Sequence, residues 1–496
     1  MAKLLKLIKN NFFYLGIGFL LFFIPIYPKF PLFGVSGTYV SIRLEDIFIA
    51  VIVGLFFLNL IIKKDFSLFK NHFSKLILLF FAVGAVSLLS AFFITKNIVL
   101  NVALFHFLRR IEYLSLFFVA YYSLKNIKQL RTYGWIVLIA TFAVIFYALG
   151  QKFFGWPVVS TMNKEFSKGL FLRLTWWARV NSTFAGHYDL AAYMVMILPL
   201  TLVTFFIAKK WFIKVMVLIL GVLCYYILIL TASRVSFAAY LLCMVTILII
   251  SRKKLLIIPF MIVSLLGMIF SADLGQRYAA TFKIDLSFLS GTVKIKTPEV
   301  AIAPTLTPTP TPVPHISLPP AQPGRVKPTP TPTPTPTPIP VATASAEYFE
   351  STTLATSRST DIRLKVEWPR AIRAFAKNPL LGTGYSSITL ATDNDYLRML
   401  GEIGLLGTLA FLAIILEFFR KIYQFLTTSK SKEEKLLVIG ILGSFIGFFL
   451  NATFIDVLEA SKIAFFFWIL MGIALKIIDL NETEKTDKAN MTNKMN

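Results

Sequence analysis

Long apolar runs, separated by short polar connections, follow one another along almost the whole chain. A helix needs about 20 apolar residues to cross the hydrocarbon core of a bilayer, and most of the runs reach or approach that length. They predict twelve membrane helices, near residues 12–27, 44–62, 75–94, 102–122, 132–151, 187–207, 211–231, 234–250, 254–271, 395–417, 435–455 and 459–478. We therefore expect an all-α, polytopic integral membrane protein. An even number of spans places both termini on the same side.

Two of the polar connections are long enough to carry function outside the membrane. Residues 1–271 are expected to hold the first nine helices, with an outer loop at 152–186. A larger extracytoplasmic loop follows at 272–394. The last three helices occupy 395–478, and residues 479–496 are a polar cytoplasmic tail.

The larger loop contains a Thr/Pro-rich tract at 297–345. Alternate residues of its Thr-Pro repeats lack an amide hydrogen, so the tract forms no hydrogen-bond ladder and is expected to be disordered. Where it is stiff it extends by about 3.1 Å per residue. Its role is left open between a tolerated insertion, a cell-wall spacer and a Thr-rich stretch that carries O-linked sugar.

Downstream of this tract, residues 363–378 predict an amphipathic helix on the outer membrane face, which Pro379 and Gly382 end. The segment has an irregular apolar stripe and basic residues around it. The stripe consists of Val366, Trp368, Ile372 and Phe375, and the basic residues are Arg363, Lys365, Arg370 and Arg373.

Composition supports the membrane assignment, because 56% of the residues are hydrophobic and only 15% are charged. The formal net charge of +25 would also suit a nucleic-acid-binding protein, so the placement of the charge decides. Basic residues gather in every second connection, as the positive-inside rule requires of cytoplasmic loops. These clusters include Lys63, Lys64, Lys70 and Lys75; Lys125, Lys128 and Arg131; Lys209, Lys210 and Lys214; and Arg252, Lys253 and Lys254. Topology explains the charge, and we expect no nucleic-acid partner.

Metal and nucleotide chemistry find little support in the sequence. The four His residues are scattered over different segments, and the two Cys residues lie inside apolar runs. No Walker or Rossmann glycine pattern is present. We expect no metal and no cofactor.

Two arginines lie where predicted spans meet the outer face. Arg234 stands between two apolar runs, and Arg179 comes shortly before the sixth span. Each side chain either extends along the apolar surface to reach the interface, or offers its planar fork to a phosphate. Two such arginines at one point of the outer leaflet would suit a pyrophosphate. His187, with Asp189 close by, either orients a substrate or caps the span.

Charged residues also lie inside the fourth span. Arg109 and Glu112 are three residues apart, so they could pair on one helix face. A structural ion pair is the favoured interpretation of Glu112.

Asp393, Asn394 and Asp395 stand directly before the tenth span. A carboxylate at this place could act as a general base, or could orient an acceptor through hydrogen bonds. Asp and Asn are also the residue types that cap helix N-termini, and a negative charge there suits the helix dipole. The two interpretations are compatible.

Three stretches together resemble the O-antigen ligase and O-antigen polymerase family of membrane glycosyltransferases. They are ARVNSTFAGHYDLAAYMVMILPL (178–200), LTASRVSFAAYLL (230–242) and WPRAIRAFAKNPLLGTGYSSITLATDNDYLRMLGEIGLLGT (368–408). The resemblance implies an inverting, metal-independent membrane enzyme that transfers glycan from a polyprenyl (undecaprenyl) pyrophosphate carrier to an acceptor hydroxyl. By position, Arg179 and Arg234 match the arginines thought to hold the donor pyrophosphate.

The resemblance has one departure. Ligases of this family tend to show His-Asn or His-Ser, then nine residues, then Gly-x-x-Gly. Here Asn394 is followed by nine residues and then by Gly404 and Gly407, but Asp393 occupies the place of the His. Either Asp393 is the base itself, or it orients the acceptor sugar, or Asp395 takes that role.

We therefore expect a glycan ligase or polymerase of cell-surface polysaccharide biosynthesis in the cytoplasmic membrane, with its active site on the outer face. The catalytic candidates are Asp393, Arg234 and Arg179, and the substrate-binding candidates are Asn394, Asp395, His187, Arg363, Arg370 and Arg373. The partners would be a polyprenyl-pyrophosphate-linked oligosaccharide, a glycan, glycolipid or protein acceptor, and the bilayer. The alternatives are a protein O-oligosaccharyltransferase with the same donor, and a non-enzymatic transporter of lipid-linked glycan.

Overall fold

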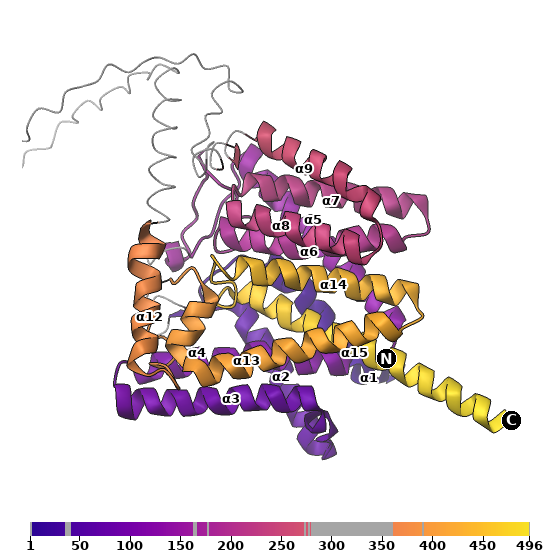
Figure 1. Ribbon diagram of the computed structural model, residues 1–496, viewed down its shortest axis with the longest axis horizontal. Helices are drawn as coiled ribbons and strands as arrows, with labels where there is room; N and C mark the ends of the chain where they lie inside the picture. The colour runs from indigo at the N-terminus through magenta and orange to yellow at the C-terminus, as the bar shows by residue number, and fades with distance from the viewer. Residues whose placement is uncertain are drawn as a thin grey trace, which may run out of the picture.

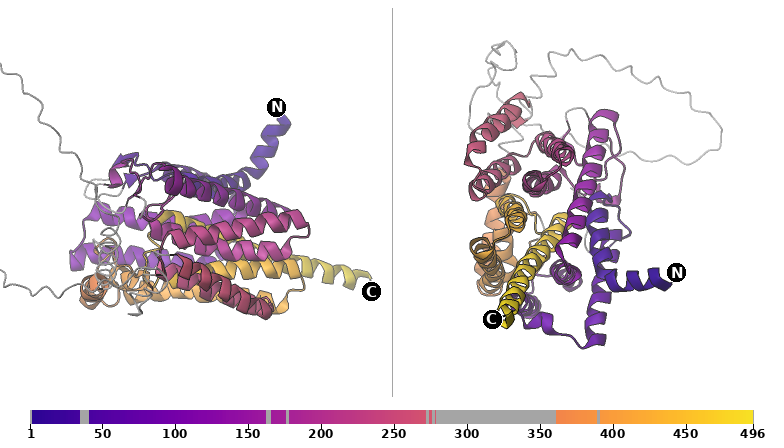
Figure 2. Two further views of the ribbon diagram at one scale, coloured as in Figure 1. Left: turned by 90° about the horizontal axis from the view of Figure 1, so that it is seen from above. Right: turned by 90° about the vertical axis from the view of Figure 1, so that its right-hand side faces the viewer.

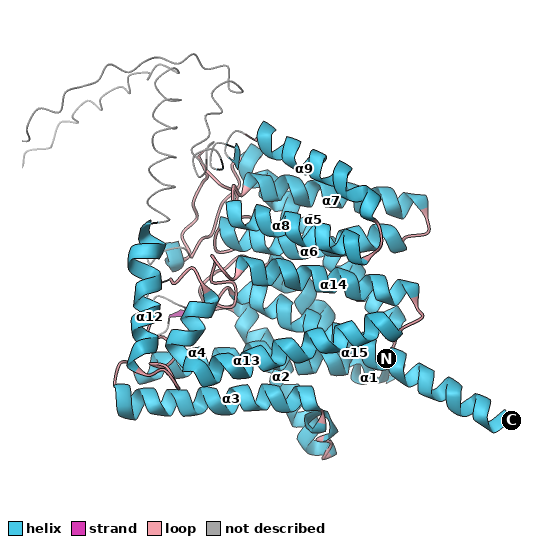
Figure 3. Cartoon of the chain, in the orientation of Figure 1, coloured by secondary structure: helices cyan, strands magenta, loops and turns pink. Residues whose placement is uncertain are grey.

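Helices make up nearly all of the structure, a computed structural model that describes residues 2–34, 41–161, 166–175, 178–271, 274–275, 278, 361–388 and 391–495 (Figure 3). The Thr/Pro-rich tract at 297–345 lies outside these residues. The helices in the first half are α1 (Ala2–Ile26), α2 (Leu44–Lys63), α3 (His72–Ser90), α4 (Leu100–Ser123), α5 (Ile127–Phe154), α6 (His187–Ile207), α7 (Trp211–Leu230), α8 (Arg234–Ile250) and α9 (Ile257–Phe270). The later helices are α12 (Trp368–Lys377), α13 (Asp395–Thr428), α14 (Lys432–Asn451) and α15 (Ser461–Met495). Two two-residue strands, β1 (Phe33–Gly34) and β2 (Ser41–Ile42), pair antiparallel between α1 and α2.

Each of the twelve apolar runs contains one of these helices, so the all-helical expectation is confirmed. In the described part of the chain, seven helices are long and apolar enough to cross a membrane: α2, α3 with the turn that extends it, α5, α6, α7, α13 and α15. The helix α8 and the apolar parts of α1 and α9 are shorter. The helix α4 carries Arg109, Arg110 and Glu112. The chain is a multi-pass membrane protein, and the number of twelve spans stays a prediction.

The long helices run side by side, and α12 lies across one end of the bundle (Figure 1). The start of α1 and the end of α15 lie at the opposite end, as a second view confirms (Figure 2). The helix α12 packs against α13, α3 packs against α13, and α4 packs against α15. The predicted amphipathic segment is therefore an end piece of the bundle.

The centre of the bundle is formed by α6 and α15. In their most apolar windows, 67% and 83% of the residues are buried, against 33% in α2 and α7. Lipid supplies no hydrophobic driving force between helices, so close contact depends on small residues. Three glycines of α14 allow such close contact. A Cβ on Gly440 or Gly447 would lie 2.4 or 2.5 Å from a side-chain atom of α6, and a Cβ on Gly443 would lie 2.1 Å from a side-chain atom of α8. These contacts hold α6, α8 and α14 together along their lengths.

The helix α13 is interrupted at Gly404, where φ is 66° and ψ is −169°. The loop before α13 enters this break: Leu405 N–H donates to the Pro379 carbonyl at 2.8 Å, and Gly384 N–H donates to the Glu402 carbonyl at 2.8 Å. A Cβ on Gly404 would lie 2.5 Å from the backbone nitrogen of Gly382. The break ties residues 379–384 of the α12–α13 loop to α13.

Candidate functional site

Three arginines from distant parts of the sequence meet at the α12 end of the bundle. Arg234 is the first residue of α8, Arg179 precedes α6, and Arg363 belongs to η5 (Arg363–Glu367), a turn of π-helix before α12. Both Arg179 and Arg363 act electrostatically on Arg234. Tyr188 interacts with Arg234 and is hydrogen-bonded to Arg363. The structure thus brings together the two arginines predicted to bind phosphate and adds a third.

Several hydrogen bonds hold the backbone around Arg234. Ser233 caps α8, and its side chain accepts from the Ser236 N–H. The Ser236 hydroxyl in turn donates to Asn451 Oδ1 of α14 at 2.7 Å. Tyr278 donates its hydroxyl to the Arg234 carbonyl. The start of α8 is therefore anchored to two other segments, which fixes the place from which the Arg234 side chain extends.

His187 belongs to the same group. It is buried at the start of α6, contacts Arg179 through Nε2, and its ring lies 4.1 Å from the Tyr188 ring, centroid to centroid. Asp189, in contrast, faces Lys29 at 4.0 Å. His187 is thus placed to orient Arg179.

Asp393 is held directly by Arg363. Its Oδ2 accepts from Arg363 Nε at 2.9 Å and pairs with Nη2 at 2.7 Å. The backbone of Asp393 is left-handed, with φ at 49°, which costs a non-glycine residue about 1–2 kcal/mol. Burial raises the pKa of Asp393 above its ordinary value, Asp456 adds to the rise, and Arg363 opposes it.

Asp456, in the loop between α14 and α15, clamps the backbone on both sides of Asp393. Its Oδ2 accepts from the Thr392 N–H at 2.9 Å, and its Oδ1 accepts from the Asn394 N–H at 3.1 Å. Arg398 Nη1 donates to the same Oδ2 at 3.0 Å. These bonds offset the cost of the left-handed conformation, so Asp456 determines where Asp393 lies.

Asn394 and Asp395 have different surroundings from Asp393. The Asn394 side chain caps α13 by accepting from the Leu397 N–H at 2.9 Å, which matches the capping interpretation. Asp395 is 3% exposed, and its Oδ2 accepts from the Leu458 N–H at 3.0 Å. Its carboxylate lies in an interior cavity.

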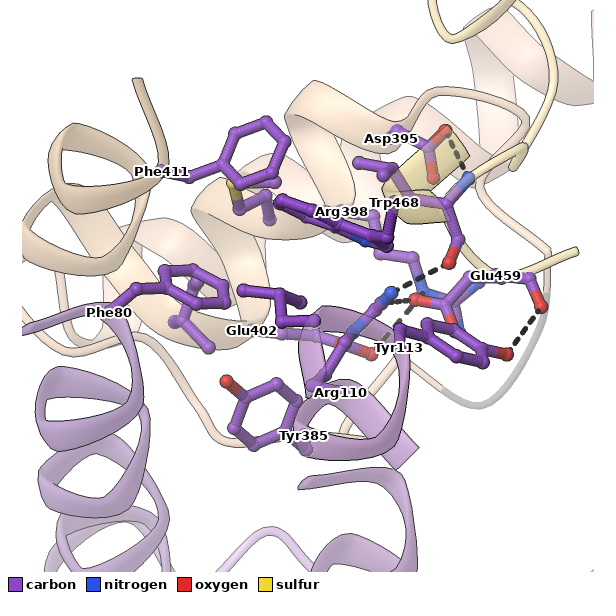
Figure 4. A pocket seen from close by; sticks show the side chains of 14 residues that line it. Phe80, Arg110, Tyr113, Tyr385, Asp395, Arg398, Glu402, Phe411, Glu459 and Trp468 are labelled. Carbon is purple, nitrogen blue, oxygen red and sulfur yellow. Dashed lines mark hydrogen bonds and ion pairs between the residues drawn. The ribbon is translucent and has the colours of Figure 1, made fainter. Parts of the chain in front are cut away.

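That cavity, shown in Figure 4, holds a network of buried charges. Arg398 lies 3.4 Å from Glu402 and 3.5 Å from Glu459, and Arg110 contacts Glu459 and donates to the Leu458 carbonyl at 2.8 Å. The cavity volume is about 30 Å³, which accommodates one or two water molecules and no sugar. The network therefore stabilises the structure next to the site, to which the Arg398–Asp456 contact connects it.

The charged residues of the fourth span are arranged differently from the expected pair. Arg109 pairs with Asp46 of α2 at 2.9 Å and donates through Nε to the Tyr113 hydroxyl at 2.8 Å. Glu112 Oε1 is buried and makes no hydrogen bond. Arg109 thus forms its direct ion pair with Asp46 of another helix, whereas Glu112 interacts with Arg109 electrostatically without a hydrogen bond from Oε1.

The two remaining predicted arginines lie on α12. Arg373 is exposed. Arg370 is half-buried, and its Nη1 has no hydrogen-bond partner. Glu367, which the sequence analysis did not select, interacts electrostatically with Asp393, Arg363 and Asp456.

Residues 219–412 match the family model described as O-antigen ligase. This match confirms the resemblance to the O-antigen ligase family. The matched segment holds Arg234, Arg363 and Asp393, whereas Arg179 and Asp456 lie on either side of it. Members of this family are glycosyltransferase-like ligases, and the family implies a lipid-linked glycan donor and a glycan acceptor in a membrane. No curated protein matches the chain.

Among the described residues, no group of three or more His, Cys, Asp or Glu side chains is arranged to hold a metal ion. The residues that the sequence analysis missed are Asp456, Tyr188 and Glu367. Asp456 is one of two acidic residues in the short loop before the last span, with Glu459, and this position was its only signal.

Proposed function

We propose that this O-antigen ligase family member transfers glycan from an undecaprenyl-pyrophosphate carrier to an acceptor hydroxyl at the outer face of the cytoplasmic membrane, in the synthesis of cell-surface polysaccharide. The observation that carries the proposal is that Arg179 and Arg363 both lie close enough to Arg234 to act on it electrostatically, and that Tyr188 interacts with Arg234 and Arg363.

Three guanidinium groups that lie near one another repel, and burial strengthens the repulsion. Asp393 offsets part of this repulsion by pairing with Arg363. A guanidinium is a planar fork that matches two phosphate oxygens. A pyrophosphate carries several negative charges within a few ångströms, so it suits a group of three arginines that one carboxylate neutralises only in part.

The charge pattern of the connections favours an outer location for this group. The basic connections α2–α3, α4–α5, α6–α7 and α8–α9 join helix ends away from α12, at the end of the bundle where α1 begins and α15 ends (Figure 1). Cytoplasmic loops carry the excess of Lys and Arg. The arginine group and α12 would then face the outside, with both termini in the cytoplasm.

The proposed reaction is a single displacement with inversion. The oxygen of the acceptor hydroxyl attacks the anomeric carbon of the donor sugar, and the bond from that carbon to the phosphate oxygen breaks. Undecaprenyl pyrophosphate leaves with the electron pair, and the hydroxyl proton goes to a carboxylate of the site. Arg179, Arg234 and Arg363 stabilise the charge that grows on the departing pyrophosphate, so the step needs no metal.

The test compares Arg234→Ala with a matched control, Arg131→Ala. Arg131, in the first turns of α5, forms a solvent-exposed ion pair with Glu433 at the start of α14. Mass spectrometry of lipid-linked glycans would be done in cells that carry the wild-type chain, either variant or no copy. We expect Arg234→Ala to match the cells without the chain, and Arg131→Ala to match the wild type. Wild-type products from Arg234→Ala would refute the pyrophosphate role.

The same measurement separates the finer alternatives. Single repeat units that accumulate without the chain identify a polymerase. Long chains that stay on the carrier identify a ligase or a protein O-oligosaccharyltransferase. An unchanged set of lipid-linked glycans with a changed distribution across the membrane would identify a transporter and exclude the enzyme.

A further inference from the structure

Three polar atoms at the start of α12 are buried and make no hydrogen bond. They are Glu367 Oε2, Trp368 Nε1 and Arg370 Nη1. Buried polar groups almost always have a partner, and an exception calls for an explanation such as a missing ligand. Three exceptions within one turn of a helix, next to a group of converging arginines, indicate a place where a polar molecule binds.

These side chains lie beside the residues already described. Glu367 is one turn after Arg363 and is close enough to Asp393, Asp456 and Arg370 to interact electrostatically with each of them. The Trp368 ring lies 5.9 Å from the Phe454 ring, centroid to centroid, and Phe454 belongs to the loop that carries Asp456. Turns of π-helix such as η5 are frequent at functional sites, because they turn side chains out of the regular helical positions.

The three groups suit a sugar. A carboxylate accepts hydrogen bonds from hydroxyls, and the guanidinium and indole N–H groups donate to hydroxyl oxygens. The indole ring also offers an apolar face to the C–H groups of a pyranose. By contrast, Asp393 already receives two N–H groups of Arg363 on its Oδ2.

We propose that Glu367, Trp368 and Arg370 form the subsite for the acceptor sugar, and that Glu367 is the base that receives the proton of the attacking hydroxyl. This inference rests on the proposed transferase function and names the acceptor side of the same site. Arg363 lies between the two subsites: it faces Arg234 on the donor side, and Glu367 follows it by one turn on the acceptor side. Asp393 then acts as a positioning residue that holds Arg363.

Electrostatics agree with this assignment. Burial raises the pKa of Glu367 to about 7; Asp393 and Asp456 add to the rise, whereas Arg363 and Arg370 oppose it. A base whose pKa lies near the working pH combines a useful deprotonated fraction with the greatest proton affinity.

In the step, the acceptor oxygen forms its bond to the anomeric carbon as its proton passes to a Glu367 carboxylate oxygen. The pyrophosphate leaves with the electrons of the broken bond and stays paired with the arginines. The proton on Glu367 returns to solvent before the next cycle, so the atoms and charges balance without another reactant.

The test measures glycan transfer by the purified full-length chain, with an undecaprenyl-pyrophosphate-linked oligosaccharide as donor, across a range of pH. The variants are Glu367→Gln and a matched control, Asp361→Asn, which also removes one carboxylate but from an exposed position of the same segment. We expect Glu367→Gln to lower kcat by about 100- to 10,000-fold, the usual contribution of a general base. The rate of the wild type should fall below about pH 7, and this fall should be absent from Glu367→Gln. The control Asp361→Asn should behave as the wild type.

A second variant, Trp368→Phe, keeps an aromatic ring, although a smaller one, and removes the indole N–H. It should raise the KM for the acceptor by about tenfold, the value of one hydrogen bond, with the KM for the donor unchanged. If the kcat of Glu367→Gln is within threefold of the wild-type value, or if its rate still falls below about pH 7, the inference is overturned and the proposed function stands. A wild-type chain that transfers no glycan overturns both.

Discussion

Asn in place of Asp456 should slow glycan transfer without preventing folding. The carboxylate accepts three hydrogen bonds, from the N–H groups of Thr392 and Asn394 and from Arg398. An amide of the same shape keeps one oxygen. If that oxygen stays at the Oδ2 position, the NH₂ group faces the Asn394 N–H at the position where Oδ1 now accepts at 3.1 Å. The substitution therefore removes at least one charge-assisted hydrogen bond and weakens the other two.

A hydrogen bond to a charged group contributes about 1.5–3 kcal/mol. This is comparable to the roughly 1–2 kcal/mol that the left-handed conformation of Asp393 costs, so its loss lets residues 392–394 leave the observed geometry. Since 1.36 kcal/mol corresponds to a factor of ten in rate, we expect kcat to fall about 10- to 100-fold. The KM for the donor should change less than kcat, because Asp456 acts on only one of the three arginines, Arg363, and does so indirectly through Asp393.

The assay is steady-state glycan transfer by the purified variant, accompanied by a thermal unfolding measurement. Glu433→Gln serves as the matched control, since Glu433 also pairs with an arginine, at 2.7 Å, but is partly exposed and lies on another part of the molecule, at the start of α14. A kcat within twofold of the wild type would refute the role of Asp456 as a clamp. An activity loss that merely follows the unfolded fraction would refute it as well.

Three other predictions concern the surroundings of the site. Asn394→Ala removes the cap of α13 and should lower the free energy of unfolding by about 1 kcal/mol, as thermal or denaturant unfolding would show; no loss would contradict the capping role. Gly404→Ala places a Cβ 2.5 Å from backbone atoms at a φ of 66°, and should sharply reduce the yield of folded protein in size-exclusion chromatography, whereas Gly134→Ala, with nothing within 4 Å, should not. The raised pKa of Glu367 means that its contribution to stability is lost as pH rises from its ordinary 4.5 through about 7, so Glu367→Gln should melt at a higher temperature than the wild type at pH 8. Below about pH 4.5 both are neutral, and the two melting temperatures should coincide; a gap that persists there would indicate another cause.

The sequence by itself determined the class of the protein and most of its helices. A bilayer demands long apolar runs with internally satisfied backbones, and this demand is local, so runs such as 187–207 and 211–231 are visible without any tertiary contact. The alternation of basic connections is local in the same way. Arg179, Arg234 and the stretch 392–408 could also be selected, because their residue types stand out against an apolar background and their order resembles a family that the match over 219–412 confirms.

Only the tertiary structure decided which charges meet. Arg109 pairs with Asp46, 63 residues away, and not with Glu112 on its own helix. Asp456 holds the backbone next to Asp393 across an equally long separation in the sequence. Asp395, next to Asn394, lies in the interior cavity and not with Asp393. Glycine at 404 is required because another segment enters the break in α13, which the spacing of Gly404 and Gly407 does not reveal. The physical reason is common to all of these: a charge removed from water takes the nearest opposite partner in space, and distance in space is set by how helices pack, not by their order along the chain.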